Sequence, residues 1–169
     1  DARMASWQSA DYLAGVIEGF YGPPWSREER RELFQWMAAW GLNTYLYAPK
    51  DDLWHRAQWR ELYPEAAGES MRTLIGDSQG HGLRFIYALG PGLDIRYSSA
   101  EDFGCIEARF RQLRGWGCRD FALLFDDIPD ELDAEDLRRW GSLAAAQCQM
   151  ANATFGWLRE GQPGARLLF

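Results

Sequence analysis

Two adjacent aspartates, Asp126 and Asp127, close a short apolar segment over residues 121–125. The segment is too short for a helix of its own and predicts a strand buried on both faces, as in a parallel sheet. Catalytic groups gather where such strands end. Paired carboxyls repel each other, and burial raises the pKa of the one that stays protonated, so the pair predicts a general acid beside an ionised partner. The same pattern also fits solvated loop residues or a cap for the next helix.

Three other predicted strand ends carry a similar mixture of residues, at positions 18–22, 47–52 and 91–94. If the strands are parallel, all these ends share one edge of the sheet. Glycine backbone, aromatic rings, Lys50 and the paired acids would then face one cleft, which suits a sugar: carboxylates for acid and base chemistry, polar groups for hydroxyls, and rings for sugar faces. Residues 50–52 also fit a solvated charged turn, and Asp94 fits either a substrate contact or a turn-stabilising role.

The elements that must position these residues alternate along the chain. Apolar runs predict strands starting near residues 14, 43, 83, 120 and 165, with an amphipathic helix in each interval. Ser26 and Glu29 form a capping box for the first helix, which Gly41 ends. The last helix is predicted to run unbroken from Leu137 to Leu158. This order indicates an α/β fold with parallel strands, either a doubly wound sheet or a (β/α)8 barrel.

The barrel is favoured because the phosphate-binding Gly-x-Gly-x-x-Gly loop of doubly wound nucleotide binders is absent after the first strand. A whole barrel needs about 250 residues. We therefore expect the first half of a barrel, four strand–helix units and the start of a fifth strand, over residues 13–169, preceded by a lead-in over residues 1–12. The end inside an apolar strand suggests a fragment.

Composition narrows the function classes. The chain has 169 residues, is 47% hydrophobic and carries a net charge of -7, which predicts one globular domain and no electrostatic footprint for nucleic acid or an anionic membrane. No apolar run approaches the ~20 residues of a membrane span. The visible start lacks a signal-peptide core, which favours a cytoplasmic location. Cys105, Cys118 and Cys148 have no metal-site spacing and are predicted to be small buried residues.

Three blocks, residues 15–25, 42–52 and 121–128, resemble the catalytic domain of O-GlcNAcases. These are the glycoside hydrolases of family 84, which also include bacterial β-N-acetylglucosaminidases once called hyaluronidases. Residues 85–88 and 91–95 match the same family, so the resemblance covers about residues 13–169. It implies a (β/α)8 barrel that removes terminal β-linked N-acetylglucosamine, including O-GlcNAc on Ser and Thr of proteins, with no metal or organic cofactor.

The resemblance also implies a retaining, substrate-assisted mechanism, an exception to the usual two-carboxylate scheme. The 2-acetamido oxygen of the substrate attacks the anomeric carbon and forms an oxazoline. Asp126 accepts the acetamido N–H, and Asp127 acts as general acid and then as general base. Gly19, through its backbone, and Lys50 would hold sugar hydroxyls, and Tyr21 would shape the pocket.

The family takes an active-site tyrosine and several Asn and Asp sugar ligands from the second half of its barrel, which this chain does not include. We therefore expect the 169 residues alone to be weak in hydrolysis and poorly soluble or self-associating, which leaves a homo-oligomer open. One alternative is a catalytically inactive carbohydrate- or glycopeptide-binding module. Another is an unrelated α/β enzyme for acyl or phosphoryl groups, against which no Gly-x-Ser-x-Gly or Walker loop is found. His55 and His81 are expected to have packing or surface roles.

Overall fold

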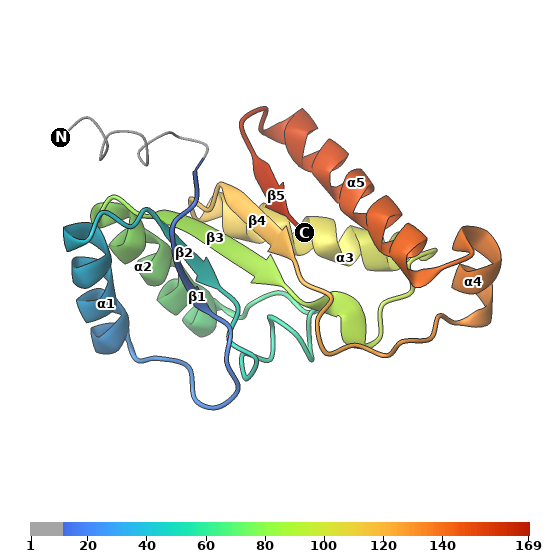
Figure 1. Ribbon diagram of the computed structural model, residues 1–169, viewed down its shortest axis with the longest axis horizontal. Coiled ribbons are helices and arrows are strands. Elements are labelled where there is room, and N and C mark those ends of the chain that lie inside the picture. The colour runs from blue at the N-terminus through green and yellow to red at the C-terminus, as the bar shows by residue number, and fades with distance from the viewer. Residues whose placement is uncertain (1–11) are drawn as a thin grey trace.

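The computed structural model describes residues 12–169, so the predicted lead-in lies almost wholly outside the described residues. Five parallel strands form one sheet in the order β1-β2-β3-β4-β5, and helices connect them (Figure 1). The strands are β1 (Gly15–Glu18), β2 (Thr44–Tyr47), β3 (Arg84–Leu89), β4 (Asp120–Leu123) and β5 (Arg166–Leu168). The α-helices are α1 (Arg27–Ala39), α2 (Glu65–Gly80), α3 (Ala100–Gly115), α4 (Ala134–Trp140) and α5 (Leu143–Gly161).

Local signals set the boundaries of α1. The Ser26 side chain accepts from the Glu29 backbone N–H, and the Glu29 side chain accepts from the Ser26 N–H, so the predicted capping box is present. At the other end, Gly41 adopts φ 74°, a left-handed conformation that costs glycine little. Phe34 and Met37 on the inner side of the helix are fully buried.

The sheet divides the apolar side chains between its two faces. On the helix-covered face, strand residues such as Tyr45, Phe85 and Phe121 join a large core with α1, α2, α3 and α5. The other face carries a smaller cluster of Leu46, Ala48, Ile86, Ala88 and Ala122. All residues of β2 and β4 are buried, as expected for interior strands of a parallel sheet.

The prediction of one unbroken helix near the end of the chain is wrong. The segment expected as a single helix from Leu137 to Leu158 is two helices, α4 and α5, separated at Gly141 and Ser142. Gly141 has φ 76°, which ends α4, and the Ser142 side chain accepts from the Ala145 N–H, which starts α5.

The cysteines also differ in part from the prediction. Cys118 is buried and Cys105 is half-buried, but Cys148 is exposed on α5.

Candidate active site

The loops after β1 and β2 are bound together at the carboxyl-terminal edge of the sheet. The Ala48 N–H donates to the Glu18 carbonyl at 3.0 Å, and the Lys50 N–H donates to the Phe20 carbonyl at 3.1 Å. These bonds continue the strand pairing beyond the strand ends. They place Gly19 beside Lys50, and both line a cavity of about 410 Å³ together with Asp126.

Lys50 and Asp126 form an ion pair across this cavity. The Lys50 side chain is only 5% exposed, whereas the Asp126 side chain is 53% exposed. Burial disfavours the charged carboxylate, but the hydrogen bond and the charge of Lys50 outweigh it and hold the pKa of Asp126 below its ordinary value. Asp126 is therefore an ionised acceptor that still faces solvent.

Asp127 lies beside the cavity and bonds to Tyr21. The Tyr21 hydroxyl donates to Asp127 Oδ2 at 2.6 Å, so loops that follow β1 and β4 meet here. Among residues 12–169, Asp127 is the one residue other than glycine that has a positive φ, which is 52°. The structure thus brings Gly19, Lys50 and Asp126 to one cavity and joins Tyr21 to Asp127 at its margin.

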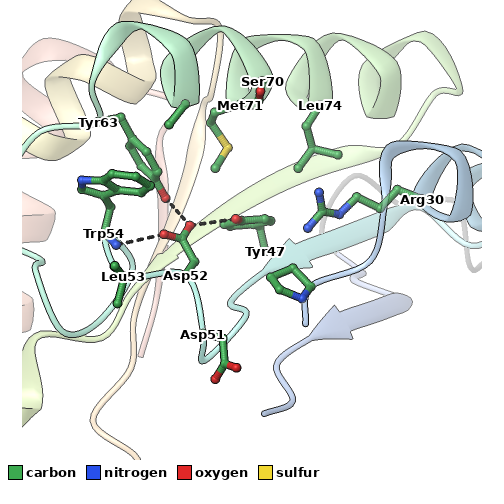
Figure 2. Close-up of a pocket in the computed structure, with 12 residues that line it drawn as sticks. Arg30, Tyr47, Asp51, Asp52, Leu53, Trp54, Tyr63, Ser70, Met71 and Leu74 are labelled. Carbon is green, nitrogen blue, oxygen red and sulfur yellow. Dashed lines mark hydrogen bonds between the residues drawn. The ribbon is translucent and has the colours of Figure 1, made fainter. Parts of the chain in front are cut away.

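Asp52 anchors the loop that carries Lys50. Figure 2 shows its carboxylate between the hydroxyls of Tyr47, at 2.7 Å, and Tyr63, at 2.6 Å, with the Trp54 N–H at 2.9 Å. Burial and the negative charge of Asp52 raise the pKa of Tyr47 well above its ordinary value. Asp52 is buried, whereas Asp51 is exposed, so the expected solvated turn holds for Asp51 and not for Asp52.

Asp94 is not among the residues that line the cavity with Lys50. It accepts from Trp59 Nε1 at 2.8 Å and from Arg60 Nη1 at 2.7 Å, which supports the turn-stabilising alternative.

The two histidines pack as expected. His55 is fully buried, with Nδ1 at 2.7 Å from the Ala88 carbonyl, and burial lowers its pKa to about 4. Because a carbonyl can only accept, Nδ1 carries the proton of the neutral ring. His81 is half-buried, with its Nδ1 2.7 Å from the Asp77 carbonyl.

Comparison with known proteins identifies the family. The family model described as beta-N-acetylglucosaminidase matches residues 14–169. The chain belongs to this family. Protein O-GlcNAcase of Rattus norvegicus and that of Mus musculus are each 46% identical to it over 149 residues. Those residues are 88% of this chain and 16% of each relative, so the chain spans about a sixth of the length of these relatives.

A solved structure supports the fold of this chain. An Asp-to-Asn mutant of the O-GlcNAc hydrolase of Thermobaculum terrenum matches with a TM-score of 0.88 and 35% identity, over 92% of this chain and 34% of that one. The predicted α/β parallel sheet is confirmed, and the match agrees with part of a (β/α)8 barrel. The roles assigned to Asp126, Asp127, Gly19, Tyr21 and Lys50 stay predictions.

One residue of this candidate site was not predicted. Arg56 donates through Nη1 to the Tyr21 hydroxyl at 2.8 Å and through Nη2 to the Asp127 main-chain carbonyl at 2.9 Å. It lies in an irregular segment after β2, where neither strand nor helix periodicity indicates which side chains reach the site.

Among residues 12–169, no cluster of His, Cys, Asp or Glu could hold a metal ion. No helix in the same range is long and apolar enough to cross a membrane.

Proposed function

We propose that the protein hydrolyses terminal β-linked N-acetylglucosamine, including O-GlcNAc on Ser and Thr of proteins, by a retaining, substrate-assisted mechanism. The observation that carries the proposal is the Lys50–Asp126 ion pair next to Asp127, at the end of β4, in a chain of the beta-N-acetylglucosaminidase family. Asp126 supplies an ionised carboxylate and Asp127 supplies a neighbouring carboxyl, both at one margin of the cavity of about 410 Å³. The names of the rat and mouse relatives support a protein-linked substrate.

In the first step, the acetamido oxygen of the substrate attacks the anomeric carbon while the glycosidic C–O bond breaks. Asp127 gives its proton to the departing oxygen, and Asp126 accepts the acetamido N–H and stabilises the positive charge of the forming oxazoline. In the second step, Asp127, now a carboxylate, takes a proton from water, which attacks the anomeric carbon and reopens the oxazoline. Gly19 and Lys50 bind sugar hydroxyls.

The test is hydrolysis of aryl β-N-acetylglucosaminides by the 169-residue chain and by a longer version that continues past Phe169. Asp127→Asn should lower kcat/KM by about 10²- to 10⁴-fold for a poor leaving group such as 4-methoxyphenol. The loss should be far smaller for 2,4-dinitrophenol, which departs without protonation. Asp130→Asn, an exposed acid in the same loop, is the matched control and should leave both rates unchanged.

The participation of the substrate's acetamido group can be tested separately, by changing that group and measuring kcat. Replacing the acetamido methyl with a trifluoromethyl group weakens the attacking oxygen and should lower kcat for the wild-type enzyme. A folded protein that binds N-acetylglucosamine but turns over no aryl glycoside would contradict the proposal and favour the inactive binding module.

A further inference from the structure

Arg56 connects three loops at the edge of the sheet. Its guanidinium donates to the Tyr21 hydroxyl and to the Asp127 carbonyl, and it lies over the Tyr21 ring with 5.7 Å between Cζ and the ring centroid. Tyr21 in turn donates to the Asp127 side chain. Arg56, Tyr21 and Asp127 therefore form a closed ring of contacts, here called the Arg56 clamp.

The clamp acts on the backbone of Asp127. Side chains of adjacent residues in an extended strand point to opposite faces, so Asp126 and Asp127 would diverge if β4 continued through them. The left-handed φ of 52° at Asp127 departs from that geometry, and such a conformation is unfavourable for a residue with a Cβ. The hydrogen bond from Arg56 Nη2 to the Asp127 carbonyl is made at this backbone unit, so it stabilises this direction of the side chain.

The clamp also fixes the direction of a hydrogen bond. A guanidinium can donate but not accept, so the Tyr21 oxygen is the acceptor in its bond with Arg56. The single proton of the Tyr21 hydroxyl is then directed to Asp127 Oδ2, 2.6 Å away. Oδ2 therefore serves as an acceptor, which leaves Oδ1 as the oxygen free to carry a transferable proton.

We propose that Arg56 is a positioning residue that, through Tyr21 and the Asp127 main chain, determines which carboxyl oxygen of the general acid carries the transferable proton. The inference rests on the proposed glycosidase function. When the glycosidic bond breaks, the proton moves from Oδ1 to the departing oxygen, and the bond from Tyr21 to Oδ2 remains to stabilise the carboxylate. The same carboxylate then accepts a proton from water, which restores the starting state.

The experiment compares 4-methoxyphenyl and 2,4-dinitrophenyl β-N-acetylglucosaminides in whichever length of the protein turns them over. Arg56→Gln should lower kcat/KM about tenfold more for the methoxyphenyl substrate than for the dinitrophenyl substrate, because only the former needs the acid. Arg56→Lys should recover only part of the loss, since a single ammonium does not reproduce the planar fork of donors. Tyr21→Phe, which removes one hydroxyl from a side chain that is 62% exposed, should show the same selective loss.

Arg60→Gln is the matched control. Arg60 belongs to the same segment but binds Asp94 and Asp102, so any effect of its loss should be equal for the two substrates. Equal losses for both substrates in Arg56→Gln and Tyr21→Phe, or no loss in either variant, overturn the role of Arg56 and leave the glycosidase function intact. Absence of turnover in the wild type with both substrates overturns the glycosidase function and the clamp together.

Discussion

At the scale of single residues, the Lys50–Asp126 ion pair explains how a buried ammonium and a half-exposed carboxylate can both stay charged at a largely apolar cavity. The cavity includes Ile17, Leu123 and Phe169, whose side chains give no hydrogen bond to a charge. Lys50 is buried and pairs with Asp126, so each side chain supplies the compensating charge for the other. The lowered pKa of Asp126 agrees with the ionised partner that the adjacent acids predict from the sequence, and the general-acid role of Asp127 stays a prediction.

The Lys50–Asp126 ion pair predicts how kcat/KM depends on pH. The pKa of Asp126 is lowered, so its carboxylate remains ionised to more acidic pH than an ordinary aspartate, and activity that needs this charge is lost only as the pH falls through that lowered pKa. Lys50→Met removes the stabilising charge and should move the acidic limb of the kcat/KM profile to higher pH. It should also lower kcat/KM at neutral pH by about tenfold or more, through the lost charged hydrogen bond.

Lys50→Arg keeps the positive charge and serves as the control, so its acidic limb should stay near that of the wild type. An acidic limb in Lys50→Met at the wild-type position would show that Lys50 does not set the ionisation of Asp126.

At the scale of elements, the strands and the residues at their ends could be predicted from the sequence because both depend on local apolar patterns. All five strands were expected in parallel order, and Gly19, Tyr21, Lys50, Asp126 and Asp127 all lie in segments that follow predicted strands. Their individual roles came from the family resemblance and stay predictions. The break between α4 and α5 was missed because apolar residues recur at three- or four-residue steps on both sides of Gly141. Arg56 was missed because its partners are 35 and 71 residues away in sequence, a proximity that only the folded sheet creates.

The stability of the loop after β2 is predicted to depend on the hydrogen bonds of Asp52. Asp52→Ala removes the acceptor for two buried hydroxyls and two backbone N–H groups, and should lower the free energy of unfolding by about 3 kcal/mol. Activity should fall as well, because Lys50 lies in the same loop. Asp51→Ala changes an exposed neighbour and should stay within about 0.5 kcal/mol of the wild type in denaturant unfolding. Equal unfolding free energies for the two variants would refute the anchoring role of Asp52.

At the scale of the whole molecule, the two faces of the sheet differ in how they are covered. Figure 1 shows α2 and α3 behind the sheet, whereas the opposite face carries the smaller cluster around Leu46 and Ile86. Ile17 on β1 is 65% exposed, and Phe169 after β5 is 62% exposed. In the described range, β1 pairs only with β2 and β5 only with β4, so two strand edges are open.

Open edges and exposed apolar side chains favour pairing between chains. We therefore expect the 169-residue chain to self-associate, with a sedimentation coefficient that rises with protein concentration. Ile17→Lys places a charge on the open edge strand and should shift the chain toward monomer. Leu137→Lys, on helix α4 and away from the sheet, removes an exposed apolar side chain of the same class and should leave the association unchanged. A wild-type chain that sediments as a monomer at every concentration would refute the self-association, and equal effects of the two lysines would locate it elsewhere than the sheet edge.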